Sequence, residues 1–530
     1  MSATINATAL ESVSSAKLPQ ADPCVLVIFG ARGDLTRRML MPALFNLACI
    51  GCMTSNRFTV VGTGRKPLSD EQFREEMRSA VATSADTANF SDERWAAFAQ
   101  RLRYVDGDLD DAAFYRDLGA HLATMQQEPG GANRLFYLST PASLAAPIVQ
   151  GLGAAGLAKN EKGWTRIVLE KPFGRDLGSA RELNRIVASV FEEKDVYRID
   201  HYLGKETVQN LLVFRFGNSI FEPVWNRNYV DYVEITAAET LGIGTRGAFY
   251  EETGALRDMV ANHLLQLLTL TAMEPPISFD ADSVREPKVQ VLRSIHPMTP
   301  ELVATRTVRG QYGPGAIQGA QVPGYRTESG VNPNSMTETY AALEFYVDNW
   351  RWAGVPFFVR TGKRLARTTT EVVVHFKRTP QALFARTPDE NVEANNIIVR
   401  IQPNEGIAFA FGAKRPGSQM EMISVQADFS YQKAFGTKSP PAYETLLLDA
   451  MRGDATLFTR ADEVEAEWRI ITPIEESWAA MPPPPFPNYA AGSDGPEEAN
   501  TLMPGESRLW RPLAEPPQIK PAADSPETAR

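Results

Sequence analysis

The chain is poor in the features that mark membrane-spanning, secreted and nucleic-acid-binding proteins. No apolar stretch approaches the length of a membrane span, and the N-terminal residues lack the basic start and apolar centre of a secretory signal. Only three of 530 residues are cysteine, so no disulfide framework is predicted and a reducing, cytoplasmic compartment is expected. A net charge of −10 argues against nucleic-acid binding but permits a local basic pocket for a small anion.

Two of the cysteines, Cys49 and Cys52, have the spacing of a redox or zinc motif. Zinc would need two further ligands, and the sequence holds no second cysteine pair. We interpret these residues as incidental to the end of a helix and predict no metal site.

The length of the chain predicts two domains, because 530 residues exceed what one core usually organises. The expected boundaries are a disordered leader over residues 1–22, a coenzyme domain over 23–200, a substrate and oligomerisation domain over 201–515, and a disordered tail over 516–530. Beyond Met481 the Pro-, Ala- and Glu-rich sequence is expected to form a loosely ordered surface covering.

The first domain begins with a strand, a glycine-rich turn and a helix. Cys24–Phe29 is a continuous apolar run typical of a buried parallel strand, and Gly30 and Gly33 follow before a helical pattern through Leu47. Glycines let the backbone approach a pyrophosphate, and a helix N-terminus offers free N–H groups to it. The spacing departs from the full dinucleotide fingerprint, so the turn alone indicates rather than establishes such a site.

The second strand of this domain ends near two basic residues. Phe58–Val61 leads into Arg65 and Lys66, at the place where a Rossmann unit meets the adenosine ribose. A basic residue there can hold the 2′-phosphate of NADP, and Arg32 in the first turn could add a further charge. The alternative is an exposed polar loop.

Further helices are predicted near residues 70–81, 92–102 and 177–192, and strands at 135–138 and 164–169. The last of these strands runs into Lys171, whose following proline holds it extended toward the crevice where α/β folds bind ligands. The fold expected is an α/β Rossmann-like coenzyme domain.

Beyond residue 227 the pattern alternates apolar and polar residues. Five such segments predict a mainly antiparallel sheet with one covered face, hence a larger α+β domain, at residues 228–236, 338–346, 371–376, 396–401 and 423–428.

The segment Arg198–Glu206 concentrates charge between an apolar strand and a helix. If it is helical from Asp200, His201 and Lys205 lie at i, i+4 on one face, suited to a phosphate, while Asp200 is turned about 100° away. The other interpretation is a solvated helix start. His263 lies in an apolar helical pattern, where a histidine is usually a core residue unless a carboxylate such as Asp200 orients it.

These features occur together in a set that resembles glucose-6-phosphate dehydrogenase over roughly residues 24–510. Five blocks carry the resemblance: Gly30-Ala-Arg-Gly-Asp-Leu, Glu170-Lys-Pro-Phe-Gly, Arg198-Ile-Asp-His-Tyr-Leu-Gly-Lys-Glu, Arg257-Asp-Met-Val-Ala-Asn-His263 and Arg351-Trp-Ala-Gly-Val-Pro-Phe-Phe-Val-Arg-Thr-Gly-Lys363. It implies NADP-dependent oxidation of glucose 6-phosphate to 6-phosphogluconolactone, the first step of the oxidative pentose phosphate pathway, by a homodimer or homotetramer.

The resemblance also implies roles for single residues. His263 corresponds to the general base for the C1 hydroxyl and Asp200 to the carboxylate that orients it, with His201, Tyr202 and Lys205 as a clamp for the 6-phosphate.

The remaining roles concern the sugar and the coenzyme. Lys171 corresponds to the lysine between sugar and nicotinamide, Glu239 and Asp258 to acceptors for sugar hydroxyls, and Lys363 and Gln402 to further substrate contacts. The coenzyme contacts implied are Gly30, Arg32, Gly33, Asp34, Leu35, Arg65, Lys66 and Lys171.

Several positions depart from the family pattern. Arg32 stands where Ser or Thr is usual, Thr36 where Ala is usual, and Thr368 where a basic residue is often found, so Arg367 is a candidate substitute. Some members hold a second, structural NADP. Of that set Arg400 matches, but Ala408, Ala410 and Asp494 do not offer the expected side chains, so only the catalytic coenzyme site is predicted.

Two other functions remain open. A non-catalytic NADP-binding regulator would be expected to have a broken His/Asp pair or phosphate clamp, and a dehydrogenase of unphosphorylated sugars would lack the basic clamp.

Overall fold

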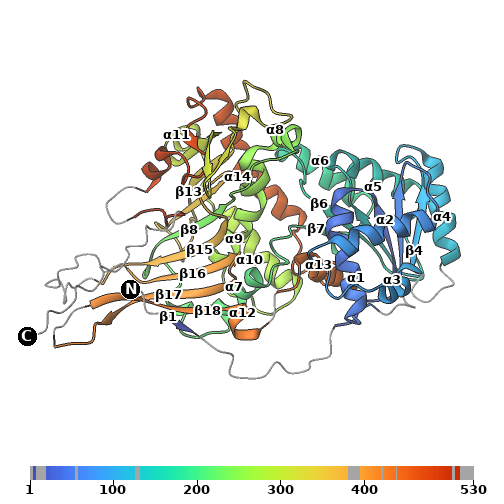
Figure 1. Cartoon of the computed structure of the whole chain (residues 1–530), viewed down its shortest axis with the longest axis horizontal. Coiled ribbons are helices and arrows are strands. Elements are labelled where there is room, and N and C mark those ends of the chain that lie inside the picture. Colours follow the sequence, from blue (N-terminus) through green and yellow to red (C-terminus); the bar gives the residue numbers. More distant parts are fainter. Residues whose placement is uncertain are drawn as a thin grey trace, which may run out of the picture.

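The computed structural model describes residues 4–6, 19–53, 58–125, 132–379, 394–418, 422–436, 439–503 and 508–513. Two sheets organise these residues. Figure 1 shows a six-stranded sheet with its helices on the right and a nine-stranded sheet on the left. The tail predicted at 516–530 lies outside the described residues.

The first domain is a parallel sheet with the strand order β4-β3-β2-β5-β6-β7. Its central strands are the apolar runs of the sequence and are buried along their length. This confirms the predicted Rossmann-like coenzyme domain. Its elements are β2 (Cys24–Phe29), η1 (Thr36–Leu40), α1 (Met41–Cys49), β3 (Phe58–Gly64), α2 (Asp70–Thr83), α3 (Asp92–Ala99), β4 (Leu102–Asp106), α4 (Ala112–Met125), β5 (Arg134–Leu138), η2 (Ala142–Leu144), α5 (Ala145–Ala154), β6 (Thr165–Glu170), α6 (Leu177–Ala188), η3 (Glu193–Asp195) and β7 (Val196–Ile199).

The prediction of one helix over 92–102 is wrong at its C-terminal end. Helix α3 stops at Ala99, and Leu102–Asp106 forms strand β4 at the edge of the sheet. The short alternation of apolar and polar side chains there fits an edge strand, which is buried mainly on one face.

The second domain is built on a mixed, mainly antiparallel sheet with the order β1-β18-β17-β16-β15-β8-β14-β13-β9. Only β8 with β14 and β1 with β18 run parallel. This confirms the predicted α+β domain and adds strands β1, β9, β14 and β17 to those predicted. The strands are β1 (Thr4–Asn6), β8 (Val230–Ala238), β9 (Thr307–Gly310), β13 (Tyr340–Tyr346), β14 (Pro356–Gly362), β15 (Thr369–Phe376), β16 (Asn396–Gln402), β17 (Gly406–Lys414) and β18 (Met422–Ser430).

Helices cover one face of this sheet (Figure 1). Helix α14 packs against α6, α10, α11 and η5, and so lies between the two domains. The main helices are α7 (Glu206–Phe216), α8 (Gly247–Ala255), η5 (Leu256–Leu264), α9 (Leu265–Ala272), α10 (Ala281–Arg293), α11 (Pro300–Arg306), α13 (Ala442–Arg452) and α14 (Ala461–Ala480). Short elements complete the domain: η4 (Glu222–Val224), β10 (Tyr312–Gly313), β11 (Gly315–Ile317), β12 (Ala320–Val322), η6 (Tyr325–Thr327), α12 (Tyr431–Phe435), β19 (Tyr489–Ala490) and η7 (Glu497–Leu502).

Two predictions about the ends of the chain need correction. Residues Thr4–Asn6 of the predicted disordered leader pair with β18, because the N–H and C=O groups of an edge strand can accept a further short strand. Beyond Met481 the described chain is less loose than expected. Tyr489, Trp510 and Leu513 are buried in a hydrophobic core with residues of strands β13 and β14. These contacts between distant parts of the chain cannot be predicted from composition.

Helix α13 crosses from the second domain to the first (Figure 1). Its apolar side chains join the core on one face of the parallel sheet. Arg166 of β6 donates to the C-terminal carbonyls of the helix, at 3.0 Å to Ala450 and 2.7 Å to Met451. Asn46 of α1 donates to Glu444 at 2.7 Å.

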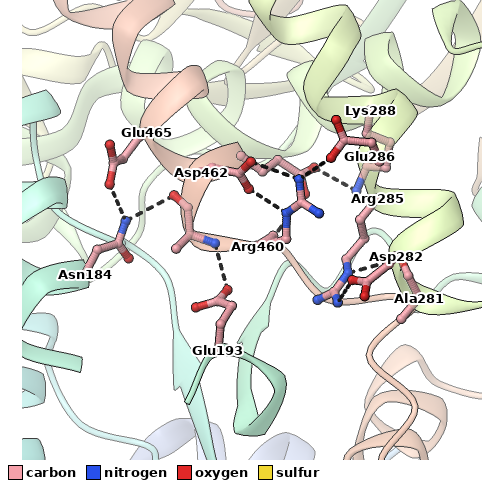
Figure 2. A network of polar contacts seen from close by, with 12 residues as sticks. Asn184, Glu193, Ala281, Asp282, Arg285, Glu286, Lys288, Arg460, Asp462 and Glu465 are labelled. Carbon is pink, nitrogen blue, oxygen red and sulfur yellow. Dashed lines mark hydrogen bonds and ion pairs between the residues drawn. The ribbon is translucent and has the colours of Figure 1, made fainter. Parts of the chain in front are cut away.

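A polar network joins the domains at the start of α14 (Figure 2). Glu193 accepts from the backbone N–H of Ala461 at 2.9 Å and from the buried guanidinium of Arg198 at 2.6 Å. Asn184 donates to the carbonyl of Ala461 and to Glu465. Helix α14, which packs against η5, is therefore bonded to residues of the first domain that come shortly before Asp200 in the sequence.

Candidate active site

The charged segment after β7 is a turn rather than the helix assumed from sequence. The Asp200 carboxylate accepts from the backbone N–H of Tyr202 at 3.0 Å, and α7 begins only at Glu206. An aspartate that bonds to the backbone two residues ahead stabilises a turn in place of a helical start. The predicted i, i+4 face therefore does not exist, and the turn itself brings His201 and Lys205 to the site.

His263 and Asp200 form a buried hydrogen-bonded pair between Nδ1 and Oδ1. Their side chains are 1% and 2% exposed. His263 lies on η5, a stretch of π-helix, which is a widened turn often found at functional sites. The predicted partnership of these two residues, far apart in sequence, is present in the structure.

Burial and charge set the protonation of this pair. Burial lowers the pKa of His263, and Asp200 only partly offsets that effect. Burial alone would raise the pKa of Asp200, but His263 holds it below its usual value. The network therefore assigns a neutral imidazole that donates from Nδ1–H to a carboxylate, which leaves the Nε2 lone pair as an acceptor.

The Nε2 side of the imidazole faces Lys171 at the carboxyl end of β6. The lysine Nζ lies 2.8 Å from Nε2 and donates to the backbone carbonyl of Asp258 at 2.8 Å. It also lies 3.4 Å from the Asp258 carboxylate. Lys171, at the end of the predicted strand, therefore lies beside the histidine.

Aromatic rings enclose the imidazole. The ring of Tyr202 stacks on that of His263 with centroids 4.2 Å apart, and the ring of His201 meets it edge-on at 4.6 Å. Burial and then the neighbouring His263 lower the pKa of His201 well below its usual value. The Tyr202 hydroxyl lies 3.5 Å from that of Thr370 on β15. Packing against these rings fixes the plane of the His263 ring.

A cation lies on the other side of Tyr202. The Nζ of Lys205 lies 3.8 Å from the centroid of the Tyr202 ring and donates to Gln402 at 2.6 Å. Burial lowers the pKa of Lys205 to about 8. A partly desolvated ammonium of this kind binds a phosphate dianion strongly because the surrounding dielectric is low.

Two carboxylates and a lysine lie next to Lys171. The buried Lys363 bonds to Glu239 and lies 3.9 Å from Asp258. Burial would raise the pKa of Asp258, but Lys171 and then Lys363 lower it to about 2. The Asp258 carboxylate is therefore charged at neutral pH, and the oxygens of Asp258 and Glu239 can accept hydrogen bonds from sugar hydroxyls.

Asp200, His201 and His263 also offer three ligand-type atoms within 4.8 Å of one another. The ammonium of Lys171, 2.8 Å from the His263 ring, repels a divalent cation at this position. Cys49 and Cys52 are free thiols whose pKa values burial raises, which disfavours the thiolate form that binds metal.

The glycine-rich turn after β2 leaves no room for a side chain at Gly30. Gly30 has φ +78°, and a Cβ there would lie 2.3 Å from the carbonyl oxygen of Ser139 at the end of β5. Thr36 donates to the Ser139 hydroxyl at 2.9 Å, which ties the helix start to the neighbouring strand. This cradle at the carboxyl ends of adjacent parallel strands fits a dinucleotide pyrophosphate. Asp34 and Leu35 begin the helix, with the exposed Asp34 3.4 Å from Arg38.

Comparison with known proteins gives the family. The family description "Glucose-6-phosphate dehydrogenase, NAD binding domain" matches residues 27–210, and "Glucose-6-phosphate dehydrogenase, C-terminal domain" matches 212–511. A glucose-6-phosphate 1-dehydrogenase from Chlamydia pneumoniae is 47% identical over 501 residues, covering 93% of this chain and 96% of the relative. The chain belongs to the glucose-6-phosphate dehydrogenase family.

Solved structures agree with this assignment. A structure described as "Glucose-6-phosphate dehydrogenase in complex with its substrate glucose-6-phosphate" superposes with a TM-score of 0.84 at 34% identity, covering 94% of this chain and 100% of that one. A glucose-6-phosphate 1-dehydrogenase from Mycobacterium avium gives 0.79 at 36% identity, covering 94% and 100%. No helix among the described residues is long and apolar enough to cross a membrane.

The departures from the glucose-6-phosphate dehydrogenase pattern have structural partners. The Thr368 hydroxyl bonds to the hydroxyl and the N–H of Thr240, at 2.9 and 3.0 Å. Arg400, the one match to the second NADP site, pairs with Asp428 at 2.5 Å. Ala408 is buried within the sheet. Arg400 is thus engaged by a carboxylate.

Sequence reasoning missed two tyrosines behind the site. Tyr137 and Tyr443 both donate to the Glu170 carboxylate, at 2.5 and 3.2 Å, and Tyr443 stacks near His201. Burial raises the pKa of Glu170 to about 7, although both hydrogen bonds oppose the change. Glu170 could have been suspected from its place beside Lys171, but no local signal connects it to a tyrosine 273 positions later.

Proposed function

We propose that this protein oxidises D-glucose 6-phosphate at C1 to 6-phospho-D-glucono-1,5-lactone with NADP, the first step of the oxidative pentose phosphate pathway. The substrate would bind between the two domains, which we place at 23–200 and 201–515, against the turn that follows β7. The observation that carries this proposal is the buried pair of His263 and Asp200, with the Nζ of Lys171 2.8 Å from the Nε2 of His263.

His263 is the proposed general base. With its Nδ1–H donated to Asp200, only Nε2 can accept the proton from the C1 hydroxyl, and Asp200 stabilises the imidazolium that forms. Its depressed pKa keeps the imidazole ready at neutral pH. Lys171 touches Nε2 and is therefore placed to hold the reacting oxygen beside it.

The proposed phosphate clamp is made by Lys205, His201 and Tyr202. Lys205 supplies the charge, and Gln402 holds its ammonium at 2.6 Å. Binding of a dianion would raise the pKa of His201 toward its usual value, because the phosphate charge favours the protonated imidazole. Glu239 and Asp258 accept hydrogen bonds from the sugar hydroxyls, with Lys363 holding both carboxylates.

NADP supplies the acceptor for the hydride when it is bound. The glycine turn at Gly30 and Gly33 would hold its pyrophosphate, since a Cβ at Gly30 would meet the backbone of the next strand. Arg65 and Lys66 are exposed at the end of β3, where the adenosine 2′-phosphate is expected. Arg32 lies in the glycine turn after β2, and its side chain extends toward α2, where it bonds to Glu76.

Replacement of His263 by Asn tests the assignment of the base. We expect a fall in kcat of roughly 10²- to 10⁴-fold, the range typical of general-base catalysis, with a much smaller change in the Kd for glucose 6-phosphate. His296→Asn is the matched control, because His296 lies at the surface and pairs with Asp348 at 2.7 Å. Near-normal kcat in His263→Asn would contradict the proposal.

The two alternatives make different predictions. A non-catalytic NADP-binding protein would produce no NADPH from glucose 6-phosphate. A dehydrogenase of free sugars would give equal kcat/KM on glucose and glucose 6-phosphate. The partly buried Lys205 beside Tyr202 and Gln402 favours the phosphorylated substrate, since such a cation would have no counter-charge to bind on glucose.

We further propose a homodimer or homotetramer and a cytoplasmic location. The free thiols of Cys24, Cys49 and Cys52 support a reducing compartment. A monomer mass in sedimentation equilibrium at micromolar concentration would contradict the proposed oligomer. Recovery of the protein outside the cytoplasm in cell fractionation would contradict the proposed location.

A further inference from the structure

One of the three cations at the adenosine end of the coenzyme site is held by a carboxylate of the protein. Arg32 donates from Nε and Nη2 to the two oxygens of Glu76 on α2, both at 2.8 Å. Arg65 and Lys66 have no carboxylate partner within the residues that the structure describes. The charged groups of this region are therefore these three cations and the carboxylates of Glu76 and Asp106, of which Glu76 is the one paired with Arg32.

These groups share one region at the carboxyl ends of β2, β3 and β4. The Tyr104 hydroxyl donates to the backbone carbonyl of Lys66 at 3.1 Å. Burial raises the pKa of the Tyr104 phenol, while the charges of Arg32 and Glu76 shift it in opposite directions, so both lie close to that ring. The ion pair thus stands beside the loop where the adenosine ribose is expected.

The pair leaves Arg32 with fewer donors for a ligand. Its Nε–Nη2 edge, one of those suited to bidentate binding of a phosphate, is already bonded to Glu76. A 2′-phosphate carries about −1.5 to −2 charges and competes with Glu76 for that edge. NAD has a hydroxyl at the same position and places no such demand on Arg32.

We propose that Glu76 limits the preference of this enzyme for NADP over NAD by holding Arg32. The inference rests on the proposed coenzyme site and adds to it a residue that determines specificity. It assigns to Glu76 an effect on NADP binding and little effect on NAD binding.

Replacement of Glu76 by Gln, with direct binding measured by titration calorimetry, tests this inference. We expect the Kd for NADP to fall roughly five-fold, the factor that corresponds to the upper range for a partly exposed ion pair. The Kd for NAD should stay within two-fold, and 2′,5′-ADP should repeat the NADP result. Glu75→Gln is the matched control, since Glu75 is the neighbouring residue on α2 and faces Arg78 at 3.7 Å.

Two further variants separate the possible outcomes. Arg32→Ser combined with Glu76→Gln should bind NADP no more tightly than Arg32→Ser alone, because the gain depends on a released Arg32. Arg65→Ala should weaken binding of NADP far more than that of NAD if the proposed coenzyme site is correct. A normal Kd for NADP in Arg65→Ala would overturn the site itself. If Arg65→Ala binds NADP more weakly but Glu76→Gln leaves the ratio of NADP to NAD affinity unchanged, only the role of Glu76 would be overturned.

Discussion

The affinity for the sugar phosphate should depend on pH through Lys205. Burial lowers the pKa of this lysine to about 8, so its ammonium begins to deprotonate just above physiological pH. The phosphate monoester has its second pKa near 6 and is a dianion above that value. Lys205 and the phosphate are therefore both mostly in these charged forms only between about pH 6 and 8.

The expected size of the effect follows from the pKa value. With a pKa of about 8, roughly nine tenths of Lys205 is protonated at pH 7 and roughly one tenth at pH 9. If only the protonated form holds the dianion, the Kd for glucose 6-phosphate rises about ten-fold across this interval, which is about 1.4 kcal/mol. Bound phosphate shifts the lysine pKa upward, so substrate and proton bind cooperatively.

The assay is equilibrium binding of glucose 6-phosphate without coenzyme between pH 6.5 and 10, which excludes the titration of catalytic steps. Lys205→Arg is the control, because a guanidinium stays protonated throughout this range and its Kd should not change with pH. A flat Kd in the unsubstituted protein, or the same rise in Lys205→Arg, would refute the reasoning.

Two other substitutions test residues around the base. Asp200→Asn should keep the substrate Kd within a few-fold but lower kcat by roughly 10²- to 10⁴-fold, since an amide cannot stabilise the imidazolium; unchanged turnover in a steady-state assay would contradict this. The raised pKa of Glu170 means that the folded state binds the proton more tightly than the unfolded chain, so stability is lost as pH rises from 4.5 to about 7. In Glu170→Gln, the change in the free energy of unfolding between pH 5 and pH 8, measured by urea unfolding, should be smaller by up to about 3 kcal/mol. The same change in both proteins would contradict this expectation.

The parts of the fold that could be predicted were those with a strong local pattern. Cys24–Phe29 is apolar throughout and is followed by glycines, so both its strand and the glycine turn after it could be predicted. The short edge strand Leu102–Asp106 and the glycine- and alanine-rich β17 gave weak patterns and were missed. Their pairing with neighbouring strands, rather than their own composition, decides their structure.

The candidate site divides in the same way. A histidine on an apolar helix is usually a core residue unless a carboxylate orients it, and Asp200 is the candidate for that role; the two residues are paired in the structure. The geometry of the turn that carries Asp200 could not be read from spacing, because the side chain itself bonds to the backbone and replaces the first helical turn. Glu76 and Tyr443 gave no signal, since their roles depend on contacts across 44 and 273 positions of the sequence.

The packing of helix α13 against the parallel sheet affects when the first domain can fold during synthesis of the chain. Leu446, Leu447 and Met451 are all 0% exposed in the core of that sheet. Burial of three such side chains contributes roughly 5–9 kcal/mol, comparable to the whole stability of an average domain. The coenzyme-binding half is synthesised first, yet its core is completed only after residue 452 has left the ribosome. A fragment that ends at residue 200 would therefore expose an apolar face and would not be expected to fold alone.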